Sequence, residues 1–224
     1  MKLIERELGL EVKLKENVIS VIVLENIARR LSLIEELYMQ WIGKEGHWML
    51  IDNEKNYELS KCMELILEPF SLQLNNKKLK TKLYQDLKVI ADDCFNIQGL
   101  ELHAHICRYL ENILEKVPYP VKYTDEWSAA ELFKLYSVEL EESEDDVCEK
   151  LFHYLKLMNQ VCGTKIFITV NLKEYLTENQ IRELYKMVRY CKLQLVLIEF
   201  RMHEKKNEGE EVYVLDKDDC IIAY

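Results

Sequence analysis

The stretch KIFITVNLKEYLTENQIRELYKMVRYCKLQLVLIEF, residues 165–200, decides the fold of this chain. It begins with the apolar run Ile166–Val170 and ends with a second run, Leu193–Ile198, as expected of strands buried on both faces. Between these runs, residues 177–189 place their apolar side chains at helical spacing. The stretch therefore predicts a strand–helix–strand unit with two parallel strands, and so an α/β fold.

Polar residues follow these predicted strands at their carboxyl ends, where parallel sheets usually bind ligands. Asn171 follows the first strand and Glu199 the second, and Glu25 follows an earlier apolar run, Val18–Leu24. This edge of the sheet can serve catalysis, bind a metal or only contribute to packing. The sequence leaves these three roles open.

The composition is that of a globular protein, with 49% hydrophobic and 31% charged residues in a chain of 224. No apolar run approaches the roughly 20 residues of a membrane-spanning helix. Acidic residues also interrupt the N-terminal stretch where a signal peptide is apolar. We therefore expect a cytoplasmic protein without a membrane partner.

Seven widely spaced cysteines with no CxxC pair argue against a disulfide scaffold and against a zinc ribbon. We expect most of them to be thiols in the core. The net charge of −10 by itself disfavours a nucleic-acid partner. An average can hide local segregation of charge, so the distribution along the chain matters more.

The periodicity of the chain changes near Pro69. Before it, residues 47–53, 57–61 and 63–69 are predicted to form short strands. After it, helical patterns predict a helix with Leu79, Leu83, Leu87 and Ile90 on one face, a second helix over about residues 100–116, and a short one capped by Ser128.

These patterns predict two domains. A discontinuous α/β domain comprises residues 1–70 and 143–224, and a helical domain, residues 71–142, is inserted into it. The pair Ser143 and Asp146 predicts a capping box at the start of the next helix, which Gly163 ends.

No motif for nucleotide or covalent chemistry is present in the sequence. A Walker A run and a GxGxxG run are absent, and Gly43-Lys44-Glu45-Gly46 lies between a predicted helix and a strand, the wrong context for a phosphate loop. His103 and His105 are two positions apart on one helix, so they face different directions and do not share a metal. We expect each histidine to be structural or solvent-exposed.

Acidic residues gather in two places, and carboxylates from flexible loops are the ligands that Ca²⁺ prefers. Asp125 and Glu126 precede a predicted helix, and six more acids crowd the loop after it: Glu139, Glu141, Glu142, Glu144, Asp145 and Asp146. The alternative is a solvated acidic loop at a helix start, where the helix dipole favours negative charge.

Four lysines lie within six residues of one predicted helix: Lys77, Lys78, Lys80 and Lys82. Such a group can neutralise nucleic-acid phosphates. The alternative is an ordinary solvated helix face, and the aromatic residues that single-strand binding uses are not interleaved here.

Four sequence blocks in order resemble the Csn-type adaptation proteins of type II-A CRISPR–Cas systems. They are KENVISVIVLEN near the start, EPFSLQLNNKKLKTKLYQDL in the middle, FITVNLKEYLTENQIRELYK in the strand–helix–strand unit and EVYVLDKDDC near the end. None is a catalytic signature, and the resemblance extends over essentially the whole chain.

The resemblance implies an α/β head related to P-loop ATPases but lacking a nucleotide site, with an inserted helical leg. It implies a non-enzymatic homotetrameric ring, stabilised by Ca²⁺, that binds double-stranded DNA ends without sequence specificity during spacer acquisition. It also implies other CRISPR adaptation proteins and the RNA-guided nuclease as partners.

On this basis the expected DNA-binding residues are Lys77, Lys78, Lys80 and Lys82. The expected calcium ligands are Asp125, Glu126, Glu139, Glu141 and Glu142. Two other functions stay open: a metal-dependent nuclease or degenerate nucleotidase that uses Glu25, Glu199 and the acidic loop, and a protein-interaction scaffold.

Overall fold

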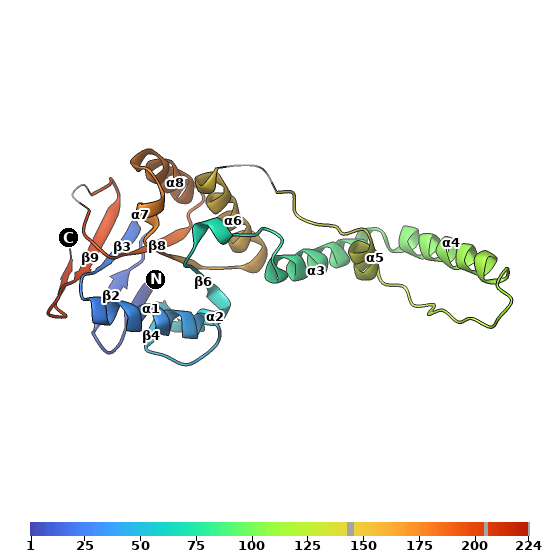
Figure 1. Cartoon of the computed structure of the whole chain (residues 1–224), viewed down its shortest axis with the longest axis horizontal. Helices are drawn as coiled ribbons and strands as arrows, with labels where there is room; N and C mark the ends of the chain where they lie inside the picture. Colours follow the sequence, from blue (N-terminus) through green and yellow to red (C-terminus); the bar gives the residue numbers. More distant parts are fainter. Residues whose placement is uncertain (143–145, 204–205, 224) are drawn as a thin grey trace. The chain divides into compact units, whose positions relative to one another are not determined.

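The computed structural model describes residues 1–142, 146–203 and 206–223. The chain divides into two compact units (Figure 1). The α/β unit comprises Met1–Gln73 and Ser143–Tyr224, and the helical unit comprises Leu74–Glu142. The domain limits expected from the sequence are 1–70 with 143–224 and 71–142, and they stay predictions. In the described part of the chain, no helix has both the length and the apolar character of a membrane span.

The α/β unit is built on a six-stranded sheet in the order β10–β9–β3–β8–β7–β6. The pairs from β9 to β6 are all parallel, and β10 runs antiparallel to β9. The strand bounds are β3 (Ile19–Leu24), β6 (Met63–Ile66), β7 (Ile166–Val170), β8 (Gln194–Glu199), β9 (Glu210–Leu215) and β10 (Ile221–Ala223).

The predicted strand–helix–strand unit is confirmed. β7 and β8 pair in parallel with Ile168 opposite Val196, and they are connected through α7 (Leu172–Tyr175) and α8 (Glu178–Tyr190). Every residue of β7 is buried, as the uninterrupted apolar run requires. The helix α8 begins at a complete capping box between Thr177 and Gln180.

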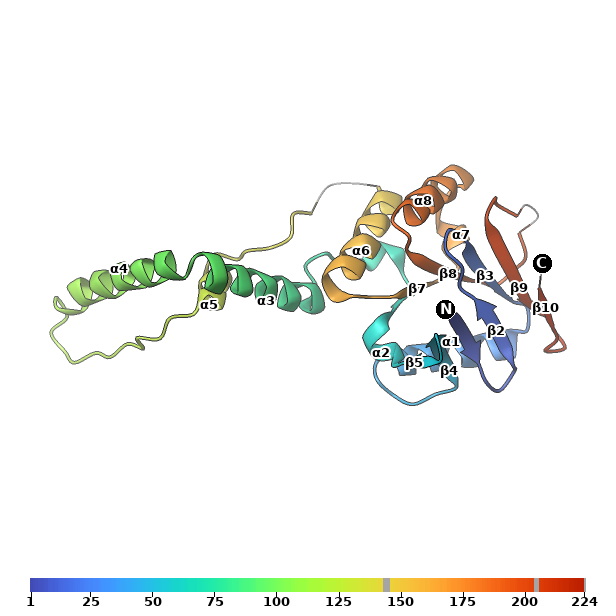
Figure 2. The same cartoon turned by 180° about the vertical axis from the view of Figure 1, so that it is seen from behind.

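Helices cover both faces of this sheet (Figures 1 and 2). On one side, α1 (Ile27–Trp41) buries Leu33 and Leu37 in a cluster with Ile22 and Ile168 of the sheet. On the other side lie α8 and α6 (Val147–Cys162), which pack against each other. Accordingly, β3, β6 and β7 are buried at every residue, whereas the edge strand β10 is exposed.

A second, antiparallel sheet extends the core beyond α1, in the order β2–β1–β4–β5. Its strands are β1 (Lys2–Glu5), β2 (Leu10–Lys13), β4 (Trp48–Asp52) and β5 (Lys55–Tyr57). Gln40 links α1 to this sheet. Its side-chain amide donates to the carbonyl of Trp48 at 2.9 Å and accepts from the Trp48 N–H at 3.0 Å.

The prediction of a strand over residues 57–61 is wrong, because Leu59–Cys62 form a helical turn, α2. Tyr57 and Leu59 alternate as in a strand, but Leu59 and Cys62 are both buried, and residues three apart face the same way in a helix.

The predicted C-cap of α6 at Gly163 is present. The predicted capping box placed Asp146 in the first turn of the helix, whereas Asp146 is itself the N-cap. The Asp146 carboxylate accepts from the Glu149 N–H at 2.9 Å, and Gly163 ends the helix in the left-handed conformation. Ser143, the other half of the predicted capping box, lies outside the described residues, as do Glu144 and Asp145 of the acidic loop.

The helical unit contains α3 (Lys77–Cys94), α4 (Asn96–Leu114) and α5 (Ala129–Leu135). Little of it is buried: in its described residues the buried apolar side chains are Leu74, Leu79 and Ala129. Ile90, predicted on the apolar face of α3, is 50% exposed. Much of the apolar surface of these helices is therefore open to solvent or to a partner.

The expectation that most cysteines lie in the core is wrong. Of the seven, only Cys62 and Cys148 are buried, while Cys94 and Cys220 are exposed. Cys94 and Cys107 are not buried because the helical unit that contains them has so small a core.

Charged side chains are buried at the carboxyl end of β8 and at the start of β9. Glu199 is fully buried, with its Oε1 accepting from the Lys173 N–H at 3.2 Å and its Oε2 lying 3.7 Å from the imidazole Nε2 of His203. Nearby, Glu210 contacts the Lys173 ammonium at 2.7 Å and accepts from the Tyr185 hydroxyl at 2.6 Å. Burial raises the pKa of Glu199 to about 7, against the opposing effect of Lys173.

This environment predicts a pH dependence of stability. Because the folded protein binds the Glu199 proton more tightly than the unfolded chain, the stabilisation is complete below about pH 4.5 and is lost as the pH rises through about 7. In the wild type, we expect this effect to lower the free energy of unfolding by about 2–3 kcal/mol between pH 5 and pH 8. We expect this decrease to be absent in Glu199→Gln. Urea unfolding at a series of pH values measures it.

The exposed variant Glu178→Gln is the control and keeps the wild-type profile. A Glu199→Gln protein that loses as much stability as the wild type over this range contradicts the assignment.

Candidate functional site

The side chains at the strand ends serve the fold. Asn171 has φ of 52°, its side-chain oxygen accepts from the Phe200 N–H at 3.1 Å, and its own N–H donates to the Ile198 carbonyl at 2.8 Å. It therefore ties the end of β7 to the end of β8. In the part of the chain that the structure describes, neither Glu25 nor Glu199 belongs to a group of three side chains placed to hold a metal.

The Gly43–Gly46 run lies in the connection from α1 to β4, as its sequence context predicts. A Cβ on Gly46 would meet the side chain of Gln40 at 2.6 Å. The glycine is thus required for the close approach of Gln40, which holds the second sheet. This role is structural.

The four predicted DNA-binding lysines all lie in the first two turns of α3, which is capped by Asn76. Lys77 and Lys78 are exposed. Lys80 contacts Glu139 at 2.5 Å, and this contact raises the pKa of the Lys80 ammonium. Lys82 lies 3.5 Å from Asp86, one turn further along the helix. Their role in DNA binding stays a prediction.

The five predicted calcium ligands lie in two groups. Glu139, Glu141 and Glu142 follow one another beside the start of α3, where Asn75 donates to the Leu140 carbonyl at 2.9 Å and to Glu142 at 3.2 Å. This group is rich in oxygen atoms, as Ca²⁺ requires. Among the described residues, no group of three close ligand side chains joins it to the second pair, Asp125 and Glu126.

Asp125 instead lies against two residues of α4 that the sequence did not single out together. Its Oδ1 is 2.8 Å from the Nε2 of His103 and 3.1 Å from the thiol of Cys107. The Cys107 sulfur lies 3.7 Å from the His103 ring nitrogens. Hydrogen bonding to Asp125 raises the pKa of the Cys107 thiol.

The expectation that each histidine is only structural or solvated overlooked this spacing. His103 and Cys107 are four positions apart and therefore share one face of α4, whereas His105 faces away. The sequence signal was a histidine and a cysteine at helical spacing. The third member could not be predicted, because Asp125 is brought to them by an irregular segment.

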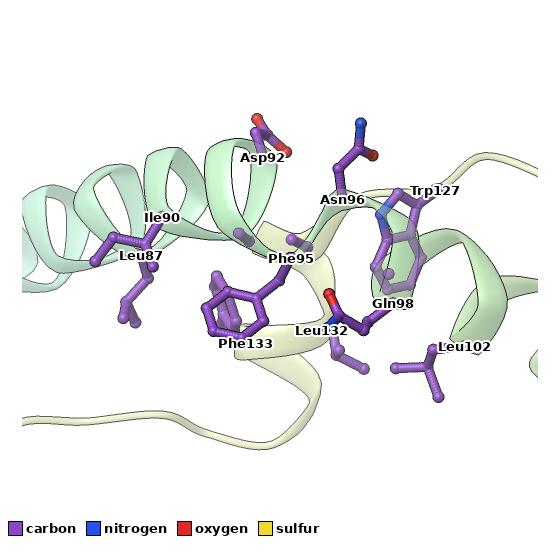
Figure 3. Close-up of a pocket in the computed structure, with 13 residues that line it drawn as sticks. Leu87, Ile90, Asp92, Phe95, Asn96, Gln98, Leu102, Trp127, Leu132 and Phe133 are labelled. Carbon is purple, nitrogen blue, oxygen red and sulfur yellow. The ribbon is translucent and has the colours of Figure 1, made fainter.

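Trp127 packs this irregular segment against α4. Its ring lies 5.6 Å from that of His103, and a Cβ on Gly99 would stand 3.1 Å from it. On its other side, Trp127 helps to line an apolar cavity of about 350 Å³ together with Phe95, Leu132 and other residues of α3, α4 and α5 (Figure 3).

A second trio of metal-ligand type, Glu5, Glu7 and His47, lies in the α/β unit. The Glu5 carboxylate is fully buried and accepts from the N–H groups of Glu7 and Leu8 at 3.0 and 2.7 Å. His47 contacts Glu36 at 2.7 Å. The Glu5 contacts close the turn between β1 and β2, and the His47 contact joins the start of β4 to α1, so we assign this trio a structural role.

Comparison with known proteins is consistent with the resemblance carried by the four sequence blocks. Residues 40–219 match the family described as CRISPR-associated protein (Cas_Csn2). The CRISPR-associated protein Csn2 of Streptococcus agalactiae is 22% identical over 213 residues, which cover 91% of this chain and 90% of that protein. The match spans both units, and the chain therefore belongs to the CRISPR-associated Csn2 family.

Proposed function

We propose that this protein binds the ends of double-stranded DNA, without enzymatic activity, during the acquisition of new CRISPR spacers. The observation that carries this proposal is the cluster of lysines in the first turns of α3 of a Csn2-family chain. The burial of Glu199 supports binding over hydrolysis, since its carboxylate lies away from any substrate that approaches from solvent.

The start of α3 suits phosphate groups for two reasons. The N-terminus of a helix carries a partial positive charge, and Lys77 and Lys78 add two exposed cations there. Lys80 and Lys82 have acidic partners at or near the surface, and exposed ion pairs contribute little to stability. DNA phosphates can compete for these two lysines.

A homotetrameric ring reconciles this cluster with the net charge of −10. Four copies that point their lysines into a shared hole concentrate positive potential there, while the outer surface stays acidic. In this proposal DNA threads through the hole from its ends. The other CRISPR adaptation proteins and the RNA-guided nuclease then act on the bound DNA.

The two units take distinct roles in the proposal. The α/β unit is a head related to P-loop ATPases, which its central parallel strands support, and it lacks their phosphate loop. The helical unit is a leg that supplies the DNA-binding lysines and contacts between subunits. Its exposed apolar side chains, such as Ile97 and Leu135, support the subunit contacts.

Calcium belongs to the same proposal. The oxygen-rich group Glu139, Glu141 and Glu142 suits Ca²⁺, and charge neutralisation there would stabilise contacts between subunits. Glu126 stays a predicted ligand. Asp125 fits Ca²⁺ less well, because its carboxylate already lies against a thiol and an imidazole.

The DNA proposal predicts a strong effect of charge reversal on α3. We expect Lys77→Glu with Lys78→Glu to weaken binding to a linear duplex at least about tenfold at low salt, because each subunit then neutralises fewer phosphates. The slope of log affinity against log salt falls by about 0.9 for each phosphate that is no longer neutralised. Fluorescence anisotropy over a salt series measures both quantities.

The matched control is Lys186→Glu with Lys192→Glu, which changes the net charge equally on the α/β unit. These lysines are 69% and 71% exposed in their side chains. An equal decrease in affinity in the two double variants would show a general charge effect and would contradict the assignment of DNA binding to α3.

The calcium proposal predicts a metal-dependent assembly state. With millimolar Ca²⁺, light scattering after size exclusion should give about four times the 26.8 kDa chain mass, and excess chelator should lower it. Glu139→Gln with Glu142→Gln should abolish the response to Ca²⁺, whereas the exposed Glu131→Gln on α5 should keep it. An identical mass in calcium and in chelator contradicts the calcium proposal.

A further inference from the structure

We propose that His103, Cys107 and Asp125 form a binding site for a thiophilic divalent cation such as Zn²⁺. The site lies within the helical unit and is separate from the proposed calcium site. It takes its ligands from one face of α4 and from the irregular segment between α4 and α5.

The geometry is close to that of a tetrahedral metal site. Zinc binds nitrogen and oxygen at about 2.0–2.2 Å and thiolate sulfur at about 2.3 Å, which places neighbouring ligand atoms roughly 3.3–3.7 Å apart. The three side-chain contacts here are 2.8, 3.1 and 3.7 Å long. Small outward movements of the Asp125 side chain, which is 70% exposed, are enough to admit an ion.

The donor set selects the class of metal. A thiolate and an imidazole together suit Zn²⁺ and similar borderline ions, whereas Ca²⁺ and Mg²⁺ take oxygen ligands. Ion binding displaces the Cys107 thiol proton to solvent. One coordination position remains for water, in the cavity of about 190 Å³ that His103 and Cys107 help to line.

Surrounding contacts hold the ligands in place. The His103 ring packs against Trp127, with the ring centroids 5.6 Å apart, and this contact restricts the rotation of the imidazole. Two residues before Asp125, the Tyr123 hydroxyl donates to Glu111 of α4 at 3.2 Å. Such supporting contacts orient metal ligands before the ion binds.

A bound metal would stabilise the helical unit, whose core is small. None of the 19 residues of α4 is buried, so few apolar contacts hold the segment around Asp125 against it. A metal that links Cys107 to Asp125 closes this loop and stabilises the folded unit by its own binding free energy.

Cobalt provides a direct test, because Co²⁺ bound to a thiolate shows charge-transfer absorption in the near ultraviolet. The full-length reduced protein, titrated with Co²⁺ alone, should show this band at one ion per chain, and Zn²⁺ should displace it while Ca²⁺ does not. Zn²⁺ should also raise the thermal unfolding temperature.

Variants locate the site. Cys107→Ser should abolish the charge-transfer band, and His103→Ala and Asp125→Asn should each weaken Co²⁺ binding at least about tenfold, because removal of even a supporting contact of a metal site costs about that much. Cys94→Ser and His105→Ala, on exposed positions of the same unit, should leave the band unchanged. The far-ultraviolet circular dichroism of each variant serves as a check on folding.

Absence of the band in the wild type overturns the proposal, and so does a band that survives in Cys107→Ser or that Cys94→Ser removes. These outcomes are independent of DNA binding and of the calcium response. Failure of the zinc site therefore leaves the proposed function standing.

Discussion

The parallel pairing of β6 with β7 is the constraint on which the rest of the chain depends. Met63 lies opposite Ile166, and the Lys165 N–H donates to the Cys62 carbonyl at 2.7 Å, although about a hundred residues separate the two strands in sequence. The chain makes this crossover through α6, whose Tyr154 hydroxyl donates to the buried Glu64 of β6 at 2.7 Å. The helical unit is inserted between β6 and α6. Because β6 is an edge strand, the insertion leaves every other ladder of the sheet intact.

The two units are stabilised in different ways. The α/β unit encloses its sheet between helices and can even bury Glu199, Glu210 and Lys173 at the strand ends. The helical unit buries little, and polar contacts between its segments, such as those of Asn75 with Leu140 and of Asp125 with Cys107, contribute to its fold. The proposed calcium and zinc sites and the proposed subunit contacts all lie in this unit.

The sequence predicted the parts of the fold that local patterns encode. The apolar runs of β7 and β8 specify buried parallel strands, and Thr177 with Gln180 marks the start of α8 because capping is a local interaction. The helical turn of α2 was missed, since four residues carry too little periodicity to separate a strand from a helix. The group of His103, Cys107 and Asp125 was missed because its third member arrives through a segment without any periodic pattern.

The central claim is that a ring of four chains admits duplex DNA only through its ends, with lysines that contact the backbone and read no sequence. A single plasmid offered as a covalently closed circle and after one enzymatic cut tests this most directly, because the two forms differ only in having ends. The account predicts that the cut form binds and the closed, relaxed circle does not. Equal affinity for the two forms contradicts it.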